Sequence, residues 1–435
     1  MAPLITYFNI FIRHKLARNA SWMLIGKSAN FLFQAAYFVL LARLLGVREY
    51  GIFAGIFAIV NTIAPYSALG AAMLLLRYVS IDQEVANKYW SNALATTAGF
   101  TLLAVICVLP LAAWLHIVGN PTMVVSLVLA NCLFSQITQL GSLLVFALGN
   151  ARLSALMSTV SNLCRLLVLV MMKVWMGHAT ATQWSVGVLI ASFTSALGVY
   201  HLVRTRLGPV SFDSALLWRR FWEGLGFSVA GTTDVVNNDV DKILLAHYQM
   251  DVQNGFYTLA YRVIDFSTSP IGALNAAVMQ RHFALSPGGI RPIKRLAAKS
   301  LCASIVLGVA IALALRFGSA LIPMMAGKSY LEAASVLNIL CILPLIRSVN
   351  LLCGSAVTGL GHQNWRTGTQ AVAALLNVAL NLMWIPKFGW HGAAWSTLAS
   401  DGTLAVLNAG LLLLIIRFAR QNISLSTGVS LKEVQ

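Results

Sequence analysis

The chain has 435 residues, of which 58% are hydrophobic and 10% are charged, and its mean hydropathy is +0.78. These values exclude an ordinary soluble domain of this length and indicate an integral membrane protein. The formal net charge of +17 would suggest nucleic-acid binding in a soluble protein, but in a membrane protein its meaning depends on where the basic residues lie.

Apolar stretches long enough to cross a membrane recur along most of the chain, with brief polar breaks between them. A helix of about 20 apolar residues crosses the roughly 30 Å of hydrocarbon in a bilayer. A membrane β-barrel would instead show segments of about ten residues with alternating polarity, which this sequence lacks. The sequence therefore predicts an all-α integral membrane protein with twelve transmembrane helices. The predicted spans are residues 19–41, 52–76, 89–114, 121–148, 153–176, 183–203, 221–246, 255–280, 297–316, 331–358, 367–385 and 391–416.

The distribution of Lys and Arg predicts the orientation of these helices. When the connections are assigned alternately to the two sides, nineteen of the thirty basic residues fall on one side, five on the other and the remainder within spans. Connections rich in Lys and Arg stay on the cytoplasmic side, so both termini are predicted to be cytoplasmic. The first apolar segment is too long for a signal-peptide core and lacks a small-residue cleavage site, so we expect it to remain as a helix.

The two halves of the chain are similar at an offset of 204 residues. At this offset Gly51 aligns with Gly255, Arg77 with Arg281, and VLLA (39–42) with ILLA (243–246). Six helices per half give both copies the same orientation, so the predicted repeat is parallel. We expect a cytoplasmic N-terminal segment 1–18, a first lobe 19–203, a cytoplasmic connection 204–220, a second lobe 221–418 and a cytoplasmic tail 419–435.

The spans of the first half contain basic residues but no acids, and residues 85–212 contain no Asp or Glu. A charge at the centre of a membrane helix costs about 2.5 to 3.5 kcal/mol, so each is a candidate for function. Polar stripes at helical spacing predict a wet, positively charged cavity; an alternative for the uncharged residues is helix–helix contact, worth about 0.6 kcal/mol each. Lys173 lies nearer a helix end and can extend to the interface. The candidates are Lys27, Asn30, Gln34, Asn131, Asn162, Arg165 and Lys173.

The spans of the second half mix acids with bases. Asp239 with Lys242, and Arg262 with Asp265, are spaced three residues apart and can form neutral buried pairs. Asp234 and Asp401 have no basic residue close in sequence, and acids beside amide and hydroxyl oxygens suit a proton or Na⁺. Arg262 and Arg347 join the cavity candidates. The candidates for a coupling ion are Asp234, Asp239, Asp241, Asn377, Asn381, Thr397 and Asp401. The six cysteines lie singly without metal-type spacing, so we expect no metal site.

Four segments carry a family resemblance: LARLLGVREYGIFA (41–54), VDKILLAHYQMDVQNGFYTLAYRV (240–263), TGLGHQNW (358–365) and LNVALNLMWIPKFGWHGAAWSTLAS (376–400). They resemble recurrent segments of the polysaccharide-exporter branch, the lipid-linked oligosaccharide (O-antigen) flippases, of the multidrug/oligosaccharidyl-lipid/polysaccharide (MOP) exporter superfamily. The most specific pattern, N-x-x-L-N-x-x-x-I-P-x-x-G-x-x-G-A-A, begins at Asn377 and contains Asn381 and Pro386.

This resemblance implies a MATE-like transporter, not an enzyme, whose two six-helix lobes surround a cavity that opens alternately to the two sides. The implied cargo is an undecaprenyl-diphosphate-linked oligosaccharide of O-antigen or exopolysaccharide synthesis, turned over in the bacterial inner membrane. It also implies coupling to a gradient of H⁺ or Na⁺. We further expect the membrane potential to contribute, because outward movement of an anionic head group is electrically downhill, and we expect no other cofactor. Asp241 matches an Asp-basic-x-x-Leu motif of the family. Expected partners are membrane lipids, a polysaccharide polymerase and chain-length machinery, with no nucleic acid.

Two other functions are considered. A cation-coupled multidrug exporter of the same superfamily should line both lobes with acids, and the acid-free stretch 85–212 argues against it. A membrane polysaccharide polymerase or ligase needs chain outside the membrane to present catalytic groups, but the longest predicted outer connection covers only residues 316–331. The sequence leaves open the sugar, the coupling ion and the oligomeric state.

Overall fold

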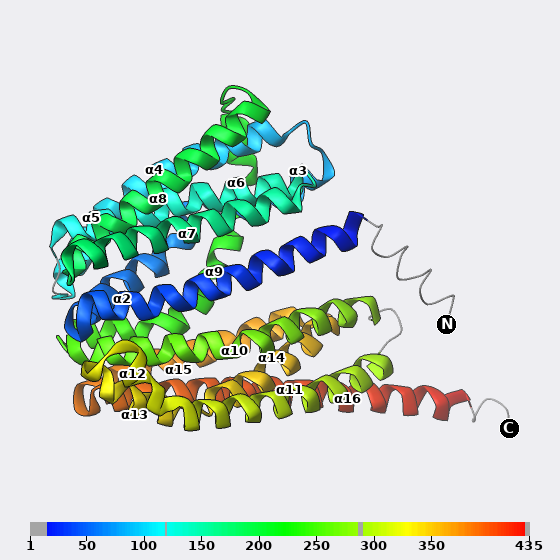
Figure 1. Ribbon diagram of the computed structural model, residues 1–435. Helices are drawn as coiled ribbons and strands as arrows, with labels where there is room; N and C mark the ends of the chain where they lie inside the picture. The colour runs from blue at the N-terminus through cyan, green and yellow to red at the C-terminus, as the bar shows by residue number, and fades with distance from the viewer. Residues whose placement is uncertain (1–14, 118–119, 286–289, 431–435) are drawn as a thin grey trace, which may run out of the picture. The chain divides into compact units, whose positions relative to one another are not determined.

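The computed structural model describes residues 15–117, 120–285 and 290–430 (Figure 1). All regular secondary structure in these ranges is helical, and every predicted span falls on helical segments. Contacts between Cα atoms divide the chain into two units, Met1–Gly255 and Phe256–Gln435. The prediction of an all-α protein is confirmed, whereas the predicted lobe and tail boundaries stay predictions.

Unit 1 begins with α2 (Lys15–Ser67), which bends at Gly46, where φ is 72° and ψ is 170°. α2 packs on α7 and α9, and α6 packs on α3, α4, α7 and α8 (Figure 1). A core cluster that includes Leu75, Trp90 and Leu144 lies between the latter helices. The further helices are α3 (Ala71–Ile81), α4 (Ala86–Trp114), α5 (Pro121–Val128), the π-helix η1 (Leu129–Phe134), α6 (Ser135–Ala147), α7 (Ala151–Met176), α8 (Ala181–Leu207) and α9 (Ser214–His247).

Unit 2 contains most of α10 (Asp251–Leu285), whose first turn belongs to unit 1. Within unit 2, α11 packs on α14, and α16 packs on α14 and α15. A core cluster that includes Ile293, Val357 and Leu412 lies among α11, α14 and α16. The further elements are α11 (Ile290–Gly318), η3 (Ser319–Leu321), α12 (Ile322–Ala326), η4 (Lys328–Tyr330), α13 (Leu331–Leu340), α14 (Leu343–Gly359), α15 (Gln363–Phe388) and α16 (Trp390–Ser430).

Several helices begin at residues that satisfy the first backbone N–H groups. Asn120 accepts from the backbone N–H of Thr122 at the start of α5, with Pro121 in the first turn. Thr180 and Gln183 form a capping box at the start of α8. These caps begin the helices directly after short connections, which helps a membrane bundle to satisfy its backbone without water.

Eight helical stretches within the described ranges are long and apolar enough to cross a membrane. A ninth arises if Lys328–Leu340 and Leu343–Gly359, bent by 45°, form one span. One of the eight, Phe33–Ile81, covers the end of the predicted span 19–41 and all of the span 52–76, and neither α9 nor α10 is among them. In α10 the charges of Arg262 and Asp265 lower the hydropathy, whereas α9 contains side chains outside the description at 230–231 and 233–234. The chain is a multi-pass membrane protein, and twelve crossings stay a prediction.

The two glycines that the repeat aligns meet inside unit 1. A Cβ at Gly51 would overlap the carbonyl oxygen of Asp251, and a Cβ at Gly255 would overlap the carbonyl oxygen of Val47. Val47 and Asp251 are themselves 204 residues apart. The two contacts therefore exchange under the repeat, as expected for surfaces related by a two-fold axis. This reciprocal contact agrees with the predicted parallel repeat at the level of single atoms.

Asn254 adds hydrogen bonds beside the backbone contacts of Gly51 and Gly255. Its buried Nδ2 donates to the carbonyl oxygens of Gly51 in α2 and Lys242 in α9, at 3.1 Å each. One amide therefore joins three helices beside the contact between Gly51 and Gly255. Glycine at 51 and 255 is required here because any side chain would occupy the position of a backbone oxygen.

Gly51→Ala or Gly255→Ala is expected to destabilise the protein by about 1 to 3 kcal/mol, because the added methyl group forces the backbones apart. Gly99→Ala in α4 is the matched control, since no atom lies within 4 Å of its added Cβ. Thermal unfolding of the purified protein in detergent measures both effects. If Gly51→Ala and Gly255→Ala unfolded at the same temperature as Gly99→Ala, the tight backbone contact would be contradicted.

Candidate functional site

A cluster of charged side chains lies inside unit 2 around Arg347 of α14. Its Nη1 donates to Asp265 of α10 at 3.0 Å, and its Nε donates to Asp401 of α16 at 3.2 Å. Its Nη2 donates to the hydroxyl of Tyr261 at 2.6 Å. The side chain of Arg347 is 16% exposed and that of Asp401 is 9% exposed. Arg347, Asp265, Asp401 and Tyr261, here called the Arg347 cluster, connect three helices through one guanidinium.

The sequence predicted only part of the Arg347 cluster. The expected pair of Arg262 with Asp265 is present at 3.9 Å, but the shorter bond of Asp265 is to Arg347. Asp401 has no base close in sequence, and the structure brings Arg347 to it from 54 residues away. Two arginines and two aspartates make this neighbourhood neutral overall. Mutual pairing is the usual way in which a membrane protein accommodates charged side chains within its bundle.

Amide and hydroxyl groups form a second buried group between α15 and α16. The Nδ2 of Asn381 donates to Asn377 at 2.9 Å, and the Nδ2 of Asn377 donates to Ser400 at 2.8 Å. The hydroxyl groups of Thr397 and Tyr257 lie 3.2 Å apart. Four predicted coupling-ion residues, Asn377, Asn381, Thr397 and Asp401, thus share the α15–α16 region of unit 2, which provides oxygen atoms of the kind that bind Na⁺ or accept a proton.

The remaining described candidates for the coupling ion lie in unit 1, on α9. Lys242 pairs with Asp239 at 2.9 Å and lies 3.6 Å from Asp241, and all three side chains are buried. The predicted pair of Asp239 with Lys242 is confirmed. Asn61 of α2 also donates to Asp239, at 2.7 Å. In the described residues, no group of three or more His, Cys, Asp or Glu side chains could hold a metal ion.

The described candidates of the first half differ in their surroundings. Lys173 donates to the carbonyl oxygens of Arg43 and Gly177 at 3.0 and 2.5 Å, so it caps the end of α7. Arg165, in the middle of α7, donates to the hydroxyls of Ser135 and Ser192 at 2.6 and 3.3 Å. Gln34 is exposed, whereas Asn131 and Asn162 are half-buried. Lys27, Asn30 and Asp234 lie outside the residues whose side chains are described, and their roles stay predictions.

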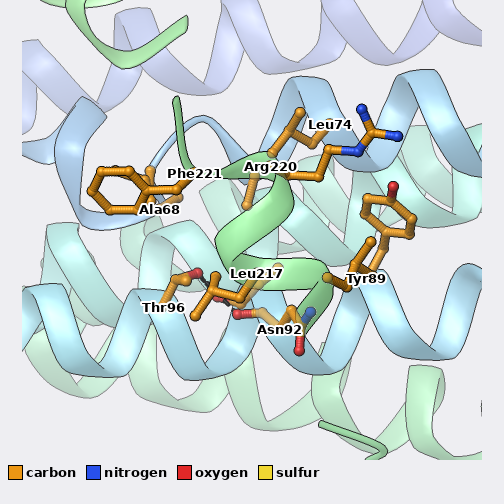
Figure 2. Close-up of a pocket in the computed structure, with 12 residues that line it drawn as sticks. Ala68, Leu74, Tyr89, Asn92, Thr96, Leu217, Arg220 and Phe221 are labelled. Atoms are coloured by element: carbon orange, nitrogen blue, oxygen red, sulfur yellow. Dashed lines mark hydrogen bonds between the residues drawn. The ribbon is translucent and has the colours of Figure 1, made fainter. Parts of the chain in front are cut away.

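A pocket that sequence reasoning missed lies in unit 1 between the end of α2, α3, α4 and the first turns of α9 (Figure 2). It holds about 380 Å³ of empty space, part of it open to the surroundings. Leu74, Leu217 and Phe221 make its wall mostly apolar, and Asn92 and Arg220 add polar groups. Such a lining suits a hydrocarbon group better than a sugar. No motif marks this pocket, because its residues come from distant segments.

Beside this pocket, an ion network joins α3 to α9. Glu223 accepts from Arg77 at 2.8 Å, from Arg220 at 3.2 Å and from the Tyr78 hydroxyl at 3.0 Å. The guanidinium of Arg220 also lies 4.1 Å from the centre of the Tyr78 ring. Because Arg77 is 59% exposed, its pair with Glu223 is worth at most about 1 kcal/mol. The network therefore positions the start of α9 more than it stabilises the fold.

The connection between α8 and α9 is bound to α4. The side chain of Asn92 donates to the carbonyl of Asp213 at 2.8 Å and accepts from its N–H at 2.9 Å. The Ser91 hydroxyl accepts from the N–H of Ser211 at 2.8 Å. Asp213 also caps α9 by accepting from the N–H of Leu216 at 3.0 Å. Side chains of α4 therefore hold the connection from which α9 begins.

Solved structures define the class of protein to which this fold belongs. A multidrug resistance MATE family transporter of the MOP superfamily, in an inward-facing conformation, matches with a TM-score of 0.72 at 12% identity, over 90% of this chain and 96% of that one. The lipid II flippase MurJ, in an inward closed conformation, matches with a TM-score of 0.69 at 15% identity, over 91% and 87%. A MOP superfamily transporter from Pyrococcus furiosus matches with a TM-score of 0.63 at 12% identity, over 93% and 95%. The fold is that of a MOP superfamily membrane transporter.

The sequence itself places the chain in a family. The sequence model of the family described as polysaccharide biosynthesis protein matches residues 16–279, which is more than half of the chain. The chain belongs to this family, and the predicted resemblance is confirmed. No curated protein sequence matches the chain.

Arg347→Met is expected to destabilise the protein by about 3 kcal/mol, because it removes the cation shared by Asp265 and Asp401, and the latter side chain is only 9% exposed. The control Arg262→Met, whose guanidinium is 3.9 Å from Asp265, is expected to cost less than Arg347→Met, because it leaves the shorter bond of Asp265 to Arg347 in place. Thermal unfolding in detergent of Arg347→Met, Asp401→Asn and the double variant measures the coupling. Strictly additive losses would show that the two side chains do not interact.

Asn92→Ala is expected to release the connection at residues 208–213, because both hydrogen bonds to the Asp213 backbone are lost. Trypsin should then cut faster after the exposed Arg204 and Arg206, which gel electrophoresis of timed digests measures. Asn87→Ala is the control, since the bond from Asn87 to this connection is a single one, to the carbonyl of Pro209 at 2.9 Å. An unchanged cleavage rate in Asn92→Ala would mean that other contacts hold the connection.

Proposed function

We propose that the protein is a flippase that moves an undecaprenyl-diphosphate-linked oligosaccharide, an O-antigen or exopolysaccharide repeat unit, from the cytoplasmic to the periplasmic leaflet of the bacterial inner membrane. Both termini would be cytoplasmic, and access to the cargo would alternate between the two sides. Family membership and the MOP fold support a transporter. The similarity to a lipid II flippase supports a lipid-linked cargo for the same fold.

One observation carries the choice of cargo: the spans of the first half contain cations and no acids. From residue 15 to 212 the acids are Glu49, Asp82 and Glu84, all in predicted connections. Arg165 meets only neutral hydroxyl groups among its described hydrogen-bond partners. A diphosphate is an anion that such a half can attract, whereas a cationic drug would be repelled. The acid-free half therefore favours the lipid-linked glycan over the multidrug cargo.

The membrane potential supports the same direction of transport. Moving one charge across 100 mV is worth about 2.3 kcal/mol. With the cytoplasm negative, outward movement of an anionic head group is electrically downhill. A carrier that returns empty, with its basic residues unpaired, moves positive charge inward, which is downhill as well. Potential alone can therefore supply much of the driving force for the proposed cycle.

A coupling cation, H⁺ or Na⁺, would bind in unit 2 at Asn377, Asn381, Thr397 and Asp401. The first two are hydrogen-bonded to each other, and the last two lie one helical turn apart on α16. The Oδ1 of Asn381 is buried and has no hydrogen-bond donor in the described part of the chain. An unsatisfied buried oxygen is costly, and a bound cation would satisfy it. The acids of α9 in unit 1, Asp239 and Asp241, form a second group for this role.

Deletion of the gene is expected to abolish the surface polysaccharide and to cause undecaprenyl-linked repeat units to accumulate inside the cell. Extraction and mass spectrometry of lipid-linked glycans, with staining of surface polysaccharide, measure both effects. A plasmid copy of the gene should restore both, and an Arg165→Met copy should restore them poorly. Normal surface polysaccharide together with new sensitivity to cationic dyes would instead identify a drug exporter.

A further inference from the structure

The pocket of unit 1 shown in Figure 2, here called the α3–α9 pocket, combines an apolar wall with a polar end. Ala68 and Phe221 lie at one end of it, Tyr89 and Arg220 lie at the other, and Leu217 lies between them. Ligand pockets of about 300 to 1,000 Å³ hold drug-sized molecules. The empty space of about 380 Å³, part of it open, can therefore hold a portion of one hydrocarbon chain.

The break between α2 and α3 forms one wall of the α3–α9 pocket. α2 ends at Ser67 and α3 begins at Ala71, and between them Leu69, which lines the pocket, has a φ of 44°, a conformation that leucine rarely adopts. A Cβ at Gly70 would overlap the carbonyl oxygen of Gly224 in α9, and a Cβ at Gly224 would overlap that of Leu69. Close backbone contacts therefore fix the break against α9. Strained positions of this kind persist only where the surrounding structure holds them, and they are frequent at ligand sites.

The first turns of α9 place the α3–α9 pocket at the surface of the membrane. α9 has 34 residues and is about 51 Å long at 1.5 Å per residue, whereas the hydrocarbon layer is about 30 Å thick. Trp218 and Trp222 in its first turns are 71% and 77% exposed, and tryptophan is enriched where hydrocarbon meets the lipid head groups. The predicted span begins at residue 221, so the start of α9 lies in the head-group layer, on the side predicted to be cytoplasmic.

The polar end of the α3–α9 pocket offers positive charge to a lipid head group. Arg77 and Arg220 share the carboxylate of Glu223, so this ion network has one more cation than anion. The Nε of Arg220 has no hydrogen-bond acceptor in the described residues, although the side chain as a whole is 30% exposed. Arg219, next to it in the chain, is exposed. Basic pockets between membrane helices on the cytoplasmic side bind anionic lipid head groups.

We propose that the α3–α9 pocket binds an anionic phospholipid of the bilayer. One acyl chain lies against Leu74, Leu217 and Phe221, and the phosphate group lies at Arg220. A phospholipid presents these groups in the required order, because its phosphate lies in the head-group layer directly above its acyl chains. The bound lipid contacts α3 and α9 together, so it stabilises the packing of the start of α9. This site does not depend on the identity of the cargo, because Arg220 lies in the predicted connection 204–220, outside the predicted spans.

The test compares lipids of different head-group charge on the full chain. The protein is purified in an uncharged detergent, and its unfolding temperature is followed as phosphatidylglycerol, or phosphatidylcholine with the same acyl chains, is added. The wild type should show a saturable rise that is larger with phosphatidylglycerol. Leu217→Trp should raise the phosphatidylglycerol concentration for half the effect about tenfold, because the larger side chain fills the space for the acyl chain. Leu102→Trp is the matched control, since Leu102 of α4 is 64% exposed and does not line the pocket.

Arg220→Gln tests the head group, because it removes the charge at the polar end of the pocket. Its response to phosphatidylglycerol should fall to the level of the response to phosphatidylcholine, whereas Arg206→Gln, at an exposed arginine of α8, should respond like the wild type. Equal responses of the wild type to the two lipids, or wild-type responses in both Leu217→Trp and Arg220→Gln, would overturn the site. A response to undecaprenyl phosphate without one to phosphatidylglycerol would overturn its assignment to a bilayer phospholipid.

Native mass spectrometry of the wild type gives a check that needs no variant. When the two phospholipids are supplied in equal amounts, the protein should retain phosphatidylglycerol in preference to phosphatidylcholine. Equal retention of the two lipids would contradict a site that selects an anionic head group.

Discussion

A charge inside the hydrocarbon layer must be neutralised or hydrogen-bonded, and this constraint accounts for most of the polar structure of the protein. Arg347 meets two carboxylates and a phenol in unit 2. Lys242 meets two carboxylates in unit 1. Arg165 meets only hydroxyls in the described chain. The first two cations are thus paired with carboxylates of the protein, whereas no ion pair of Arg165 is found among the side chains that the structure describes.

The difference in how these cations are paired bears on the proposed cargo. A transporter must bind its cargo and release it, so the charge that attracts the cargo must not already be paired within the protein. A first half without intramembrane acids meets this requirement for a diphosphate. The neutral Arg347 cluster and the buried amides between α15 and α16 instead offer oxygen atoms that suit a small cation. In the proposed transport cycle the two kinds of polar group would have different roles.

The features that sequence predicted are those that depend on neighbours along one helix. The spans follow from hydropathy, and the pair of Asp239 with Lys242 follows from a spacing of three residues. The repeat also predicted which glycines are equivalent, although not that Gly51 and Gly255 touch the partner backbone. Arg347 with Asp401, and Asn92 with Asp213, could not be predicted, because these pairs are separated by 54 and 121 residues. Helical periodicity carries no information about which distant face a side chain meets.

By itself the sequence determined that this is a helical membrane protein of the polysaccharide-exporter kind and that the predicted spans of its first half contain basic residues but no acid. Composition and motifs are enough for these two conclusions, because a charge within the membrane is costly whatever the tertiary structure. Only the tertiary structure decided which cations have partners within the protein. Arg347 and Lys173 have acceptors because other helices, or the end of their own helix, bring oxygen atoms to them, whereas the helices around Arg165 bring only hydroxyls. Packing, and not residue type, decides which cations are paired within the protein.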